Sequence, residues 1–177
     1  GAIFSIFYWS FYFLRMGTTG LTAQADGAHN RAETQRILIR AVIIAALLGI
    51  AVWMLRYPIS WGGFAVLQGE AGVESKGAAY LLARTWGSPA ALATFALTGW
   101  LIGLGRNSAT MAIYAVFTGI NISLDLWFVL GLGYGPAGVG AATSIADWGA
   151  ALMATGFVLH ALSRQGGWAA GVLERAR

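Results

Sequence analysis

The sequence predicts an all-α, polytopic bundle of membrane-spanning helices, and three observations lead to that fold class. Apolar residues make up 58% of the 177 residues and charged residues only 10%, whereas charged residues form about 25% of an average soluble domain. Five long stretches are almost free of charge, and turn residues or basic residues separate them. A chain with so few charges cannot cover its own surface with polar groups, so we expect it to fold in a bilayer.

Five predicted helices follow one another along the chain. Each is a nearly uncharged run of membrane length, and they cover about residues 3–25, 37–55, 85–105, 108–130 and 137–162. The second ends before Pro58 and the third has Pro89 near its start, because proline is tolerated in the first turn of a helix but not in its interior. The alternative is a set of long buried helices in a soluble protein, which the scarcity of charged residues disfavours.

The charged residues between the predicted helices indicate which way the chain crosses the bilayer. The segments 26–36 and 105–107 and the tail after residue 162 lie on one side, since two predicted helices separate each from the next. With Arg40, that side carries seven basic residues, against three in the loop 56–84 on the other side, which are Arg56, Lys76 and Arg84. The positive-inside rule then places Gly1 outside and Arg177 in the cytoplasm.

Two glycine patterns have structural explanations. Gly99 and Gly103 form a GxxxG pair in the third predicted helix, which favours close helix packing because small residues let two backbones approach. Residues 133–138 match GxGxxG, but a dinucleotide site needs a strand before the motif, and here it joins two helices. A tight turn accounts for these glycines.

Several function classes are disfavoured by what the sequence lacks. It contains no cysteine, which excludes disulfides and thiolate metal sites. Its two histidines, His29 and His160, belong to no Ser/His/Asp or His/Glu set of the kind that an intramembrane hydrolase needs. The net charge of +4 comes from residues at helix ends rather than from a basic patch. We therefore expect no enzyme, no metal cofactor and no nucleic-acid partner.

Three ionisable residues lie inside predicted helices: Arg15, Asp125 and Asp147. Such residues are costly in a membrane and usually face a cavity or an ion path. Asn121 precedes Asp125 by one helical turn, so the amide and the carboxylate share a face. Arg15 lies near mid-membrane, where it is either a counter-ion to the aspartates or a structural residue in a polar pocket. A structural role between helices remains the alternative for each polar residue, and for Asp147 the two interpretations are equally supported.

The last two predicted helices form a hairpin whose turn is centred near Tyr134. In a straight antiparallel hairpin, residues equally distant from the turn lie at equal depth. This places Asp125 level with Thr143, and Asn121 level with Asp147, so the four residues are predicted to form one polar cluster. Oxygen donors of this kind suit a hard cation such as Na⁺. A carboxylate in a cavity that is alternately wet and dry can also load and release a proton, since burial favours its neutral form.

The sequence does not begin with methionine and opens within an apolar run, so we expect at least one helix upstream of Gly1. Residues 13–25 (FLRMGTTGLTAQA) closely resemble the second helix of transporters of the MATE (multidrug and toxic compound extrusion) family, DinF-like branch. Residues 121–125 (NISLD), 131–138 (GLGYGPAG) and 141–143 (AAT) resemble the fifth and sixth helices of that family. The resemblance implies that residues 1–177 are part of the amino-terminal lobe, helices two to six, of a twelve-helix fold.

The resemblance also implies a function and a site. It implies a bacterial cytoplasmic-membrane antiporter that exports organic or drug-like compounds against an inward H⁺ or Na⁺ gradient, with no other cofactor. The implied cation site matches Asn121, Asp125 and Thr143, and includes an aspartate on a first helix that this sequence lacks. Asp147 matches no family role. The implied partners are the substrate, the bilayer, that first helix and a carboxy-terminal lobe.

Two other functions remain as alternatives. One is a flippase of the same superfamily that moves lipid-linked saccharides, which a large cationic cavity would favour and the sparse charge of this chain does not. The other is a membrane scaffold that transports nothing, which the ionisable residues inside the predicted helices disfavour.

Overall fold

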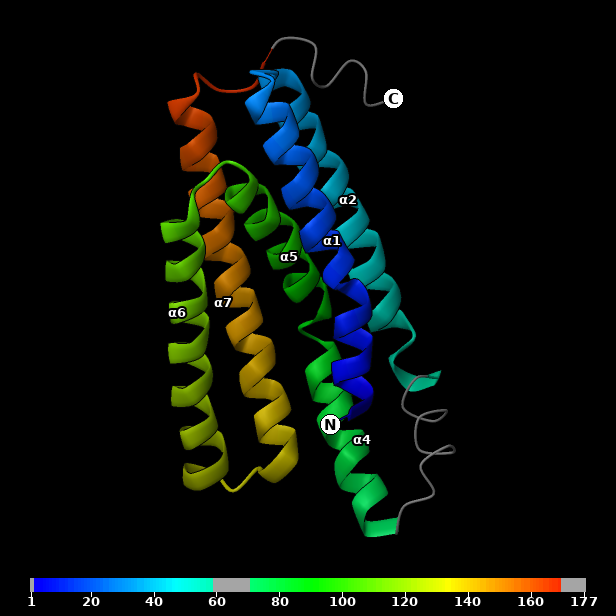
Figure 1. The fold of residues 1–177 in the computed structure, drawn as a ribbon. Coiled ribbons are helices and arrows are strands. Elements are labelled where there is room, and N and C mark those ends of the chain that lie inside the picture. The colour runs from blue at the N-terminus through cyan, green and yellow to red at the C-terminus, as the bar shows by residue number, and fades with distance from the viewer. Residues whose placement is uncertain (1, 59–70, 170–177) are drawn as a thin grey trace.

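The structure is a computed structural model that describes residues 2–58 and 71–169, with side chains described for 11–58 and 76–169. Over these residues the chain is a bundle of helices (Figure 1). The helices are α1 Ala2–Gly27, α2 Arg31–Met54, α4 Ala71–Thr85, α5 Ser88–Gly103, α6 Asn107–Asp125, the π-helix η1 Leu126–Gly131 and α7 Gly135–Arg164. The described chain contains three helices that are long and apolar enough to cross a membrane, namely α2, α6 continued by η1, and α7. The predicted all-α transmembrane class is confirmed.

The loop predicted before the third helix differs from the structure. The prediction had one helix over residues 85–105 after a loop over 56–84, whereas the structure has α4 over Ala71–Thr85 and a shorter α5 over Ser88–Gly103. The two follow each other end to end (Figure 1). Hydropathy missed α4 because its sequence mixes Glu74 and Lys76 with apolar residues, and such a segment folds by packing one face on a neighbour. That neighbour is α7.

Helix α5 is the centre of the bundle and packs against α1, α2 and α7, while α6 packs mainly on α7. Its residue Trp100 is fully buried, and its indole Nε1 donates a hydrogen bond to the Thr34 carbonyl oxygen of α2 at 2.8 Å. A buried indole N–H needs such a partner. The bond therefore fixes how α5 sits against α2, among the buried side chains of Leu38, Leu97 and Leu101.

The GxxxG pair of α5 faces α1, a partner that the sequence did not identify. A Cβ added at Gly99 would lie 2.8 Å from the Arg15 carbonyl oxygen, and one at Gly103 would lie 2.5 Å from the Thr22 Cβ. The Thr19 hydroxyl of α1 donates to the Gly99 carbonyl oxygen at 3.0 Å. Close packing of two helices, the role predicted for these glycines, is confirmed.

The turns group at two ends of the bundle. The α1–α2 turn and the residues after α7 lie at one end, and the α6–α7 turn lies at the other (Figure 1). At the first end, the Gln35 side chain of α2 donates to the Gly167 carbonyl oxygen at 3.1 Å and accepts from the Ala169 N–H at 2.8 Å. These bonds tie the segment after α7 to the start of α2.

Candidate functional site

The polar residues of the α6–α7 hairpin meet at one point. The Asn121 side chain of α6 donates through Nδ2 to the Thr143 hydroxyl oxygen of α7 at 3.1 Å. The Thr143 hydroxyl accepts this bond and donates one of its own to the Val139 carbonyl oxygen at 2.9 Å. The amide oxygen of Asn121 is left without a donor among the described side chains, so it is available as a ligand.

Asp125 lies one turn along α6 from Asn121, as the spacing predicted. Its side chain is half-buried, and its Oδ1 atom is buried without a hydrogen-bond partner in the described part of the chain. A buried carboxylate oxygen without a partner is costly, and such groups in native proteins mark strain, a bound ion or a functional role. Asp125 and Asn121 therefore present two uncommitted oxygens on one face of α6.

The depth pairing predicted for the hairpin is shifted. Asn121 is level with Thr143, whereas the prediction placed Asp125 there and Asn121 opposite Asp147. The cause is η1, where the Leu132 N–H bonds to the Trp127 carbonyl oxygen five residues back, at 3.0 Å. A π-helix places more residues in each turn than an α-helix, so more residues are needed to cover the same height. Asn121 is accordingly ten residues from the end of η1, and Thr143 only eight from the start of α7.

Asp147 belongs to a different cluster from Asp125. Its Oδ2 lies 2.5 Å from Nη1 of Arg84, the penultimate residue of α4, and the two side chains are only 9% and 10% exposed. This partner was not predicted from the sequence, and the ion pair and hydrogen bond of the Asp147 side chain are with Arg84 rather than with Asn121 or Asp125. Arg84 was also assigned to an exposed loop, whereas the structure buries it. A basic residue three positions before a Gly-Ser-Pro helix start was the signal in the sequence that could have located this pair.

The Arg84–Asp147 pair lies at the break between α4 and α5. At that break the Gly87 N–H donates to the Ser144 hydroxyl oxygen at 3.1 Å, and this hydroxyl donates to the Ala83 carbonyl oxygen at 2.7 Å. A Cβ added at Gly87 would lie 2.8 Å from Asp147 Oδ2. Backbone groups freed by a helix break at membrane depth must find partners inside the protein. Helix α7 supplies them through Ser144, and the ion pair stands beside that contact.

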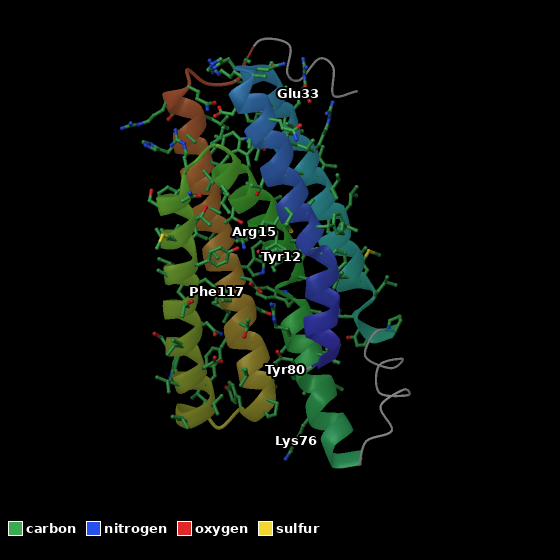
Figure 2. The ribbon with its side chains drawn as sticks, in the orientation of Figure 1. Tyr12, Arg15, Glu33, Lys76, Tyr80 and Phe117 are labelled. Atoms are coloured by element: carbon green, nitrogen blue, oxygen red, sulfur yellow. The ribbon has the colours of Figure 1, made fainter. Side chains whose placement is uncertain are left out.

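The guanidinium of Arg15 forms no ion pair with Asp125 or Asp147. Its guanidinium lies over the rings of Tyr12 and Tyr114, 5.5 Å and 5.3 Å from their centroids, which are cation–π distances. Figure 2 shows Arg15 and Tyr12 on α1. Of the two interpretations open to the sequence, counter-ion to the aspartates or residue of a separate pocket, these contacts favour the second.

The described residues differ in what they could hold. No group of three or more histidine or acidic side chains that could chelate a metal occurs in residues 11–58 and 76–169. The face formed by Asn121, Asp125 and Thr143 instead offers single carboxylate, amide and hydroxyl oxygens, which are the ligands of a weakly held hard cation or of a proton. The position of this face, beside a π-helix in a two-helix hairpin, is where an exchangeable ion would be expected, since π-helical turns are frequent at functional sites.

Comparison with known proteins identifies the family. The sequence model of the MatE family matches residues 1–127. The chain belongs to the MATE family. Proteins of this family are transporters rather than enzymes. The expectation that the chain is not an enzyme is thereby confirmed.

A curated relative agrees with this assignment. The chain is 36% identical over 154 residues to the DNA damage-inducible protein F of Escherichia coli (strain K12). The match includes 87% of this chain and 34% of that protein, so the chain spans about a third of the length of this relative. The resemblance to the DinF-like branch of the MATE family is confirmed.

Solved MATE structures share the fold. The chain superposes on an outward-facing conformation of a multidrug resistance MATE family transporter with a TM-score of 0.83, at 19% identity, over 98% of this chain and 41% of that one. It superposes on an inward-facing conformation of such a transporter with a TM-score of 0.78, at 21% identity, over 83% of this chain and 33% of that one. At these identities the similarity shows the helical arrangement alone.

Proposed function

We propose that this chain is part of the amino-terminal lobe of a transporter that exports small organic, drug-like compounds in exchange for H⁺ or Na⁺. The observation that carries the coupling role is the buried, unpartnered Oδ1 of Asp125 beside the Asn121–Thr143 hydrogen bond. Membership of the MATE family supports the transport role. The first helix and the carboxy-terminal lobe expected from the sequence would complete the transporter.

The proposed coupling follows from the chemistry of the α6–α7 face. A proton or Na⁺ that binds Asp125 neutralises a carboxylate that otherwise lacks a partner, with the Asn121 oxygen and the Thr143 hydroxyl as further ligands. An ion shifts a conformational equilibrium only through its different affinity for the two states. We propose that the ion binds more tightly to the state that opens inward, so that its arrival from outside accompanies the release of the exported compound.

The orientation that we propose from the charge distribution also indicates from which side of the membrane the face formed by Asn121, Asp125 and Thr143 would be reached. The basic end, with the α1–α2 turn and the segment after α7, would lie in the cytoplasm of a bacterial inner membrane. The α6–α7 turn would then lie outside. Asp125 is six residues before the end of η1 at Gly131, so it would be reached from the outer side, where the driving ion is abundant. Burial of Arg84 strengthens the charge asymmetry, because it removes one of the three basic residues counted on the outer side.

The test uses the full-length parent protein in inverted membrane vesicles. Uptake of a fluorescent organic cation is followed under an imposed proton gradient and then under a sodium gradient, for wild type and Asp125→Asn. We expect wild type to respond to one gradient, which identifies the ion, and Asp125→Asn to respond to neither. Uptake by Asp125→Asn equal to that of wild type would overturn the coupling role of Asp125.

A matched control separates coupling from folding. Ser123 lies on the same helix, and its hydroxyl donates only to the Gly119 carbonyl oxygen of its own helix at 2.8 Å. Ser123→Ala should therefore keep full gradient response. Wild-type protein that moves no organic compound under any gradient would contradict the export function itself, and would favour the flippase or the scaffold.

A further inference from the structure

A second polar site lies between α1 and α6, and its lining includes none of Asn121, Asp125 and Thr143. It is a hollow of about 450 Å³ lined by Arg15, Ile102, Asn107, Thr110, Met111 and Tyr114. Three of these side chains are basic or hydroxylic, Arg15 from α1 and Thr110 and Tyr114 from α6, while Ile102 and Met111 are apolar. A hollow of this size with a few convergent polar groups on an apolar wall has the character of a small-molecule site.

The positive charge in this hollow has no counter-charge in the described chain. Arg15 makes no ion pair with any carboxylate of residues 11–58 and 76–169, although its guanidinium is always protonated. Its hydrogen bonds are also few, because Nη1 donates only to the Tyr12 hydroxyl at a long 3.4 Å. The two tyrosine rings hold the guanidinium by its faces. Most of its N–H donors therefore remain free at the edge of the plane, where carboxylates bind.

Two hydroxyl groups in the same hollow also lack partners. Thr110 is only 6% exposed, and its Oγ1 is buried without a hydrogen bond in the described structure. The hydroxyl of Tyr114 is likewise buried and unpartnered, four residues further along the same face of α6. Buried hydroxyls normally have a partner. Both residues line the same hollow as the Arg15 guanidinium, and two unpartnered hydroxyls there indicate a group that accepts hydrogen bonds.

The start of α6 adds to this preference. Asn107, the first residue of the helix, lines the hollow, and the capping residue Arg106 makes no side-chain cap bond. The free N–H groups and the positive end of the helix dipole attract negative charge. Guanidinium, hydroxyl and helix terminus all donate hydrogen bonds or carry positive charge, so they share a preference for an oxyanion. The apolar wall adds a preference for an attached hydrophobic body.

We propose that Arg15, Thr110 and Tyr114 form a subsite for the carboxylate of an amphipathic organic compound, held with its apolar body against Ile102 and Met111. The inference rests on the proposed export function, because it names the chemistry of a compound that the transporter exports. Such a compound carries an acidic group. A zwitterion with a separate cationic centre fits this description, whereas a purely cationic compound would gain no affinity from this subsite.

The test compares two dyes that differ only at the carboxyl group. Rhodamine B carries a free carboxylate, and its ethyl ester has the same cationic ring system without that charge. Binding of each to the purified full-length parent protein is followed by fluorescence anisotropy, which needs no transport. We expect Arg15→Gln to weaken rhodamine B binding about tenfold or more, since a bond to a charged group is lost, and to leave ester binding nearly unchanged.

Further variants keep the test independent of folding. Arg15→Lys keeps the charge and should retain part of the preference for rhodamine B, and Thr110→Val should reduce it by a smaller factor. Arg40→Gln, which alters an exposed arginine at the surface, should change the binding affinity of neither dye. Equal weakening of both dyes by Arg15→Gln, or no weakening of either, would overturn the carboxylate subsite.

The outcomes also separate this inference from the proposed function. If Arg15→Gln weakens the binding of rhodamine B but not of its ester, and wild-type vesicles accumulate neither dye under any gradient, the export function is contradicted and the subsite is supported. If vesicles transport the dyes and Arg15→Gln does not discriminate between them, the subsite fails and the export function stands. Loss of both dyes in Arg15→Gln would point to an acidic side chain elsewhere in the parent protein as the partner of Arg15.

Discussion

Arg84 at the end of α4 and Asp147 in the middle of α7 form a buried ion pair at 2.5 Å, 63 residues apart in the sequence. The pair stands at the α4–α5 break, beside the Ser144 hydroxyl that bonds the freed backbone. Each charge compensates the other where water is excluded. The pair therefore has the character of a fixed structural contact, in contrast to Asp125, whose Oδ1 has no partner among the described residues.

The first prediction concerns this pair. Arg84→Gln leaves the Asp147 carboxylate buried without its ion-pair partner, and breaking a buried pair in this way costs about 3–5 kcal/mol. We expect a large fall in the unfolding midpoint of the full-length protein in detergent, measured by circular dichroism. The double variant Arg84→Met/Asp147→Leu should recover most of this stability, because no uncompensated charge remains.

The matched control for the pair is Arg40→Gln. Arg40 pairs with Glu33 at 3.3 Å, but its side chain is 65% exposed, and exposed pairs contribute about 0–1 kcal/mol. Its unfolding midpoint should stay close to that of wild type. A double variant as unstable as Arg84→Gln would contradict this prediction, since the loss of stability would then not come from an uncompensated buried charge.

The second prediction concerns the helix break at Gly87. A Cβ there would lie 2.8 Å from both Asp147 Oδ2 and the Ser144 Cα, and forcing an extra carbon into a packed interior costs about 1–3 kcal/mol. Gly87→Ala should therefore lower the unfolding midpoint. Gly119→Ala is the control, because nothing lies within 4 Å of its added Cβ and it is inside α6. That variant should be neutral or slightly stabilising. Equal effects of the two substitutions would argue against close packing at the break.

The third prediction concerns the bond between Asn121 and Thr143. If these residues act as a unit, Asn121→Ala and Thr143→Val should each raise the half-saturating concentration of the coupling ion by up to about tenfold, the value of one hydrogen bond. The double variant should be little worse than either single one, because residues that share a bond are not additive. Ion dependence of dye uptake in vesicles measures this. Independent, multiplicative effects would mean that the 3.1 Å contact does not serve ion binding.

Part of the candidate site could be predicted because local spacing fixes it. Asn121 and Asp125 are one helical turn apart and must share a face of α6, and the structure places both there. The register across the hairpin could not be predicted in the same way. It depends on how many residues fill each turn, and the π-helical turns of η1 were not visible in the composition of residues 126–131. The shift therefore brought Asn121, rather than Asp125, opposite Thr143.

The partners of Asp147 and Arg15 could not be predicted from residue spacing within one helix or one hairpin. Asp147 was considered together with Asp125 because both lie in one hairpin, but its partner Arg84 comes from α4, a helix too polar to be recognised by hydropathy. Arg15 was considered as a counter-ion to the aspartates because all three lie inside the membrane. Its contacts are instead with Tyr12 and Tyr114. Contacts between distant segments depend on how the helices pack, which no window of sequence contains.

The sequence by itself determined the fold class, the close helix packing at Gly99 and Gly103 and the face shared by Asn121 and Asp125. These follow from hydrophobic run length, from small residues four apart and from the 3.6-residue period, all of which are local properties. The tertiary structure alone decided that α1 is the helix packed on those glycines and that α4 precedes α5. It also decided that, among the described residues, Asp147 is paired and Asp125 is not, and that Arg15 lines a hollow with two hydroxyls that lack partners there. The physical reason is that a buried charge takes its partner from whichever helix packing brings within hydrogen-bond reach.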